Sequence, residues 1–201
     1  MYSYIFDIGG VLIIYEYRKI VEALHEKTGC EISKIEELFK LERIYPVETG
    51  KISGHEFYNN YVVPIMPRLS YEEWIQNFVD NSYLNRPGME LLLELKNKGR
   101  DVYLLSNLAD FHKIAMERTV PGLFDICKRN FLSYELGYHK PEAEIYKAVC
   151  EAIGAKPETC VFFDDMKENV EGAKKVGLIG IQFSNQEIAS IRKRVEELDS
   201  F

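Results

Sequence analysis

Short apolar runs alternate with amphipathic helical segments through the C-terminal two thirds of this chain, and this alternation restricts the fold more than any other feature. The apolar runs are at 102–105, 161–163 and 178–181, with helical patterns at about 88–98, 110–118, 142–153 and 167–176. Strands separated by helices favour a parallel sheet with helices packed against it. A further apolar run at 2–6 suits a central strand of the same sheet. We therefore expect an α/β fold.

The segment 15–85 has a different pattern, with few strand signals. It contains three S-x-x-E sequences, and a fourth lies near the C-terminus: Ser33/Glu36, Ser53/Glu56, Ser70/Glu73 and Ser184/Glu187. Each predicts a helix start, because the serine hydroxyl accepts from an amide of the first turn and the glutamate accepts from the serine amide. We therefore expect a helical insert at 15–85 between two parts of one core, 1–14 and 86–201.

Composition and charge narrow the class of protein. The chain has 201 residues, of which 46% are hydrophobic and 12% aromatic, enough for a packed interior. A net charge of −7 disfavours general affinity for nucleic acid or anionic membranes, and no apolar run approaches the roughly 20 residues that span a bilayer. The four cysteines are scattered, which is typical of reduced thiols. We expect a cytoplasmic monomer or weak homodimer with no nucleic acid or membrane partner.

Polar residues stand at the ends of the apolar runs. Asp7 follows the first run, Ser106 and Asn107 follow the second, and Asp164 and Asp165 end the next. Ligands of open parallel sheets bind outside the carboxyl ends of the strands, so we expect these side chains to converge. Lys140, directly before Pro141, lies in a loop long enough to reach them.

These residue types suit phosphoryl transfer. A carboxylate such as Asp7 can attack phosphorus and form an aspartyl-phosphate, dividing one difficult hydrolysis into two easier steps. Asp164 and Asp165 offer the hard oxygen ligands that Mg²⁺ prefers, and Lys140 offsets the repulsion between carboxylate and phosphate. A helix cap or a solvated acidic turn is the alternative for each carboxylate taken singly.

A phosphate cradle is expected beside these groups. The Ser106 hydroxyl and the amides of Ile8, Gly9 and Asn107 are its candidate donors. Lys140 would bind the same phosphate.

Four motifs in order give the chain a family resemblance. They are Phe6-Asp7-Ile8-Gly9-Gly10-Val11, Leu104-Leu105-Ser106-Asn107, Lys140-Pro141-Glu142 and Val161-Phe162-Phe163-Asp164-Asp165. The chain resembles the haloacid dehalogenase-like hydrolase superfamily over nearly its whole length, and within it the bacterial α-D-glucose-1-phosphate phosphatases. The resemblance implies a Rossmann-like core with a helical cap inserted after the first motif. It also implies Mg²⁺ held by Asp7, Asp165 and the Gly9 carbonyl, with Asp164 binding directly or through water.

One position departs from most phosphatases of that superfamily, which carry an aspartate two residues after the nucleophile. Here that position is Gly9. Losing a positioned general acid typically costs about 10²–10⁴-fold in rate. An anomeric phosphate, whose leaving hydroxyl is more acidic, would need less protonation. Alternatively the insert supplies the group, from His55, Glu48, Lys51 or Tyr58.

We therefore expect a Mg²⁺-dependent phosphatase acting on a small phosphorylated metabolite, a sugar phosphate such as glucose 1-phosphate. Gly9 favours one alternative, a non-catalytic module that binds a phosphorylated ligand. A 2-haloacid dehalogenase is the other, and the Asp164-Asp165 pair disfavours it.

The sequence also indicates roles near the substrate or the carboxylates for four other side chains. His112, soon after the second motif, is expected near the substrate, and Asn169 is expected to orient Asp165 or contact the cap. Tyr15 and Tyr45 are candidates to face a sugar.

Overall fold

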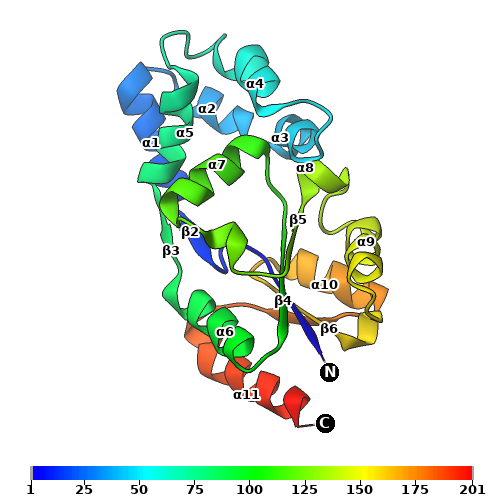
Figure 1. The fold of residues 1–201 in the computed structure, drawn as a ribbon. Helices are drawn as coiled ribbons and strands as arrows, with labels where there is room; N and C mark the ends of the chain where they lie inside the picture. Colours follow the sequence, from blue (N-terminus) through cyan, green and yellow to red (C-terminus); the bar gives the residue numbers. More distant parts are fainter. Residues whose placement is uncertain (1, 201) are drawn as a thin grey trace.

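The computed structural model describes residues 2–200, and its centre is a five-stranded sheet in the order β5-β4-β1-β6-β7 (Figure 1). Every neighbouring pair in this sheet is parallel. The strands are β1 (Ser3–Phe6), β4 (Asp101–Ser106), β5 (Arg129–Leu132), β6 (Cys160–Asp164) and β7 (Ile179–Gln182). The predicted α/β fold is confirmed, with the N-terminal strand at the centre of the sheet.

Helices cover both faces of this sheet, and the alternation of side chains along β1 shows how. The core helices are α6 (Arg86–Asn97), α7 (Asp110–Thr119), α8 (Ser133–Leu136), α9 (Ala143–Ile153), α10 (Lys167–Val176) and α11 (Ile188–Asp199). Tyr4 and Phe6 pack with α6 and α11, whereas Ile5 packs with α9 and α10 on the opposite face. Short 3₁₀ turns lie at Leu123–Asp125, Pro157–Thr159 and Asn185–Glu187.

The segment between β1 and α6 is mainly helical and has a hydrophobic cluster of its own (Figure 1). Its helices are α1 (Tyr17–Thr28), α2 (Ile32–Leu38), α3 (Leu41–Glu48), α4 (Gly54–Phe57) and α5 (Tyr71–Asp80), with a π-helical turn at Tyr58–Val62. Trp74 and Phe57 are fully buried in that cluster. Phe111 and Ala115 of α7 belong to it as well, so α7 serves both packing units.

Two short strands join this helical insert to the core. β2 (Ile13–Tyr15) pairs antiparallel with β3 (Ser82–Leu84) and sets Ile13 opposite Leu84. The sequence analysis predicted neither strand, because three residues are too few to establish an alternating pattern. The expected boundaries at 14/15 and 85/86 fall at or beside this ribbon. We keep the division into 1–14 with 86–201 and 15–85 as a proposal.

Two of the four predicted capping boxes are confirmed. Ser53 with Glu56 begins α4, and Ser70 with Glu73 begins α5. The Ser33 prediction is wrong: the extended N-cap residue of α2 is Glu31, so Ser33 already lies inside the helix. The prediction for Ser184 is wrong in extent, since its hydroxyl accepts from the Gln186 amide and caps only a 3₁₀ turn before α11.

Two of the four cysteines lie closer together than their positions in the sequence indicate. Cys150 of α9 and Cys160 of β6 are buried free thiols whose sulfur atoms lie 3.8 Å apart, although the sequence showed no close pair. Ten residues separate them along the chain, and the fold brings them together.

Within residues 2–200 we find no helix with the length and apolar character needed to traverse a bilayer.

Candidate active site

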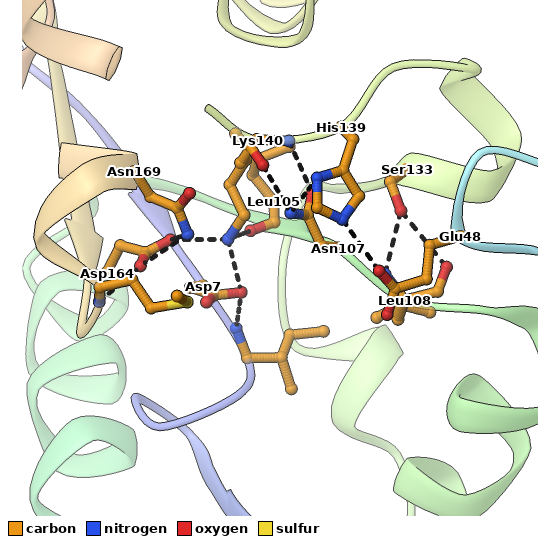
Figure 2. A network of polar contacts seen from close by, with 12 residues as sticks. Asp7, Glu48, Leu105, Asn107, Leu108, Ser133, His139, Lys140, Asp164 and Asn169 are labelled. Atoms are coloured by element: carbon orange, nitrogen blue, oxygen red, sulfur yellow. Dashed lines mark hydrogen bonds and ion pairs between the residues drawn. The ribbon is translucent and has the colours of Figure 1, made fainter. Parts of the chain in front are cut away.

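A buried ionic cluster lies at the carboxyl end of the central strands (Figure 2). Asp7 follows β1, Asp164 ends β6, and Lys140 reaches both from the loop between α8 and α9. The Lys140 Nζ atom lies 2.9 Å from Asp7 Oδ1 and 2.6 Å from Asp164 Oδ2, and it also donates to the Leu105 carbonyl at 3.3 Å. Only 2% of Lys140 is exposed. The structure therefore brings together the nucleophile candidate, the cation and one of the predicted metal ligands.

Burial and charge act in opposite directions on this cluster. The pKa of Asp7 is raised to about 7, because burial and then Asp164 raise it by more than Lys140 lowers it. Burial lowers the pKa of Lys140, but Asp7 and Asp164 together raise it above its ordinary value. The pKa of Asp165 is raised by burial and by Asp164. One lysine thus faces three carboxyl groups, an excess of negative charge that favours a bound cation.

The three carboxyl groups are close enough to share a metal ion. Ligand oxygens of Asp7, Asp164 and Asp165 all lie within 4.8 Å of one another. Gly10 makes this approach possible, since its φ is +71° and a Cβ at this position would stand 2.2 Å from Asp165 Oδ2. An all-oxygen donor set fits Mg²⁺. The Gly9 carbonyl as a further ligand stays a prediction.

Asn169 of α10 has a different neighbour from the one expected. Its Nδ2 lies 3.1 Å from both carboxylate oxygens of Asp164, and within residues 2–200 its side chain makes no hydrogen bond to Asp165 or to the insert. The Met166 amide donates to the same carboxylate at 2.9 Å. These donors fix the orientation of Asp164, so the expectation for Asn169 was one residue wrong.

The predicted phosphate-binding groups surround Asp7. The Ile8 amide donates to Asp7 Oδ1 at 2.7 Å, and a hydrogen bond from the Ser106 hydroxyl helps to lower the pKa of Asp7. Ser106, Gly9 and Asn107 line the pocket above the carboxylate. Their contact with phosphate stays a prediction.

Asn107 has a role that the sequence analysis missed. Its Oδ1 accepts from the Lys140 amide at 2.8 Å, and its Nδ2 donates to the Lys140 carbonyl at 3.0 Å. The side chain therefore pairs with the backbone of Lys140 much as a neighbouring strand would, and holds the lysine in place.

A line of hydrogen bonds leads from this lysine to the insert (Figure 2). Because Asn107 Oδ1 accepts from a backbone amide, its Nδ2 must donate, and it lies 3.0 Å from His139 Nδ1. That ring nitrogen accepts, so the proton is on Nε2, which lies 2.9 Å from Glu48 Oε2 of α3. The sequence analysis did not single out His139, although it directly precedes Lys140.

A pocket of about 730 Å³ opens above Asp7, between the sheet and the insert. Of the four insert residues considered as acid candidates, only Glu48 lines it. Lys51 faces a second, smaller pocket, and His55 stacks on Tyr71 with ring centroids 3.8 Å apart. The Tyr58 hydroxyl is turned to the Leu69 carbonyl.

Of the three other residues expected near a substrate, two line the pocket and one does not. His112 and Tyr15 line the pocket, and burial lowers the pKa of His112. Tyr45 does not line it, and its hydroxyl donates to Glu142 Oε1 at 2.7 Å.

Comparison with known proteins shows that this chain is similar to hydrolases. Residues 3–177 match the family model for haloacid dehalogenase-like hydrolases. A sesquiterpene phosphatase, astK, of Aspergillus oryzae is 30% identical, over 90% of this chain and 89% of that protein. A D-ribitol-5-phosphate phosphatase of Bacteroides thetaiotaomicron is 28% identical, over 90% of this chain and 91% of that protein.

A solved structure agrees with the sequence relatives. It is a HAD family enzyme from Bacteroides thetaiotaomicron in complex with magnesium and inorganic phosphate. The two chains are 29% identical and superpose with a TM-score of 0.80, covering 92% of this chain and 94% of the other.

Proposed function

We propose that this chain, which belongs to the haloacid dehalogenase-like hydrolase family, is a Mg²⁺-dependent phosphatase that hydrolyses a small phosphate monoester through an aspartyl-phosphate on Asp7. The observation that carries this proposal is the buried contact of Lys140 with Asp7 and Asp164 at the base of a pocket. The phosphatases among its relatives, and the magnesium and phosphate of the similar structure, support it.

Asp7 performs the bond exchange in this mechanism. One carboxylate oxygen attacks phosphorus, a new oxygen–phosphorus bond forms, and the ester bond breaks with its electron pair on the leaving oxygen. Water then attacks the phosphorus of the aspartyl-phosphate, which releases inorganic phosphate and returns Asp7 to a carboxylate. Lys140 lies against Asp7 in the resting site and offsets negative charge in both steps.

The metal site belongs to the same proposal. Asp7, Asp164 and Asp165 would hold Mg²⁺, which supplies positive charge beside a phosphate that approaches a carboxylate. Asn169 keeps Asp164 in position for this purpose.

The proton for the leaving oxygen needs a source other than residue 9. A Cβ at Gly9 would lie 3.9 Å from the Tyr15 ring, so the position has room for a side chain but carries none. Either the leaving hydroxyl is acidic enough to depart unaided, or Glu48 donates from the opposite wall of the pocket. The sugar phosphate expected from the sequence, glucose 1-phosphate in particular, stays an untested prediction.

Phosphate release from a panel of aryl, alkyl and sugar monophosphates, with Mg²⁺ or with a chelator, tests the proposal. We expect Mg²⁺-dependent release and a phosphorylated Asp7 peptide in mass spectra after rapid acid quenching. Ligand binding that needs Mg²⁺ but gives no release would favour the non-catalytic binding module. Release of halide from a 2-haloacid without Mg²⁺ would favour the dehalogenase.

A further inference from the structure

The two sides of the pocket differ in chemistry. The side formed by the sheet, which we call the floor, carries Asp7, Lys140 and Asp165. The side formed by the insert, which we call the roof, is mainly apolar. Its side chains include Tyr15, Ile20, Phe39, Leu41, Ile44 and Phe78.

Charge on the roof is confined to Glu48. Among the pocket-lining residues within 2–200, it is the one ionisable carboxyl or amine that the insert contributes. Its Oε2 already accepts from His139 Nε2 at 2.9 Å. The roof residues that line the pocket thus offer no lysine or arginine to a second phosphate or a carboxylate.

Apart from Glu48 and the Tyr15 hydroxyl, which has no hydrogen-bond partner within residues 2–200, this roof suits an apolar group better than a polyol. Hydroxyl groups that leave water without new hydrogen-bond partners cost free energy. An apolar group gains about 0.8 kcal/mol for each methylene it buries, which corresponds to about fourfold in affinity. A pocket of about 730 Å³ is large enough for a drug-sized group beside the phosphate.

The mouth of the pocket carries the same character. Leu41, Tyr17 and Met166 all line the pocket, and they are 61%, 47% and 48% exposed. Large apolar side chains gathered at the rim of a cavity mark a surface that another apolar group covers. They extend the apolar path from the roof toward solvent.

We propose that the substrate is a phosphate monoester of an apolar alcohol, with its phosphate on the floor and its apolar group against the roof and mouth. The inference rests on the proposed function for the phosphate end alone. It replaces the sugar expected from the sequence with an aliphatic or aromatic leaving group.

A series of 4-n-alkylphenyl phosphates tests this proposal, because the acidity of the phenol stays nearly constant while the chain grows. Affinity is measured by calorimetry on the Asp7→Asn protein with Mg²⁺, because this variant avoids turnover and keeps an oxygen at residue 7 for the metal. We expect about fourfold tighter binding per methylene until the pocket is full, and weaker binding of glucose 1-phosphate than of the longer esters. Equal affinity along the series, tighter binding of glucose 1-phosphate, or no binding of any ester would overturn the proposal.

Turnover of phenyl phosphate by the unmodified protein reports on the proposed function separately. Hydrolysis without any dependence on chain length would leave the phosphatase intact and remove the apolar substrate. Binding that tightens with chain length, but without hydrolysis, would support an apolar ligand and contradict the proposed phosphatase.

A matched pair of leucines locates the effect. Leu41→Ser changes an exposed leucine at the mouth, and Leu93→Ser changes one on α6 that is 39% exposed and does not line the pocket. We expect Leu41→Ser to reduce the gain per methylene for the longest chains and Leu93→Ser to leave it unchanged. An equal effect of both, or of neither, would contradict placement of the chain at the mouth.

Discussion

The floor and the roof of the pocket differ in polarity and in exposure to solvent. On the floor, a lysine that is 2% exposed contacts two buried carboxylates, and amide groups of the chain fix their positions. The roof is apolar except for Glu48, and its outer part stays open to solvent. One polar line, from Lys140 through Asn107 and His139 to Glu48, connects the two sides. If the proposed function holds, bond chemistry and recognition of the leaving group reside in separate packing units of one chain.

The largest effect is expected on the floor. Asp7→Asn replaces the attacking carboxylate with a neutral amide, a poor nucleophile, and we expect turnover to fall by on the order of 10⁴-fold or more while the fold persists. Initial rates of phosphate release and far-ultraviolet circular dichroism measure the two properties. Asp125→Asn, at an exposed aspartate outside the pocket, is the control. Undiminished release by Asp7→Asn would rule out the covalent route.

Gly9→Asp tests whether the floor lacks only an acid. A Cβ at Gly9 meets the Tyr15 ring at 3.9 Å, an ordinary contact, so the change is sterically allowed. We expect faster hydrolysis of alkyl phosphates, by up to about 10²-fold, with little change for aryl phosphates. Gly9→Asn has the same size without the acid and should give no gain. Equal gains from both variants would show that acid catalysis is not what residue 9 limits.

Removal of the metal should destabilise the floor as pH rises. The pKa of Asp7 is raised from 3.8 to about 7, so the folded protein binds a proton more tightly than the unfolded chain. Without Mg²⁺, this contribution to the free energy of unfolding is present below pH 4 and is lost as pH rises to about 7, by on the order of a few kcal/mol. Urea denaturation at several pH values, with and without Mg²⁺, measures it.

Asp7→Asn is the control for that pH dependence, because asparagine does not titrate. We expect the variant to lack the loss between pH 4 and 7, and Mg²⁺ to restore stability to the unmodified protein at pH 7 and above. The same slope in both proteins would assign the pH dependence to other groups.

The smallest effect is expected where floor and roof meet. Glu48→Gln keeps an acceptor for His139 Nε2 but removes the acid. We expect kcat/KM for alkyl phosphates to fall about tenfold, less than the usual loss for a positioned acid, because Glu48 Oε2 is already bound to His139. Aryl phosphates, with better leaving groups, should be affected less. Glu42→Gln changes an exposed glutamate of the same helix and should change neither rate. Equal losses on both substrate classes would indicate that Glu48 positions the insert and does not donate the proton.

The sequence predicted the floor better than the roof, for a physical reason. Asp7, Ser106 and Asp164 stand at the ends of buried strands, and parallel topology alone brings such ends together. The apolar runs and the helices between them are local patterns in the sequence. Their alternation is therefore enough to predict which strand ends form the floor.

The polar line between floor and roof depends on contacts between segments that share no local sequence pattern. Glu48, Asn107 and His139 come from three separate parts of the chain, and their hydrogen bonds depend on how the insert lies over the core. The same applies to the sulfur atoms of Cys150 and Cys160. Ser33 failed for the opposite reason, since its pattern was local and the helix began two residues earlier.

The ribbon of β2 and β3 has a consequence for how this protein could acquire new substrates. Ile13 lies opposite Leu84, so the chain leaves the core and returns to it at neighbouring positions. A different insert could be grafted at that junction without changing the order of the five parallel strands. Phe111 and Ala115 of α7 pack within the insert, so they would have to be exchanged with it. An insert with a different roof, exchanged at this junction together with those two side chains, would then lie over the same Asp7, Lys140 and Asp164.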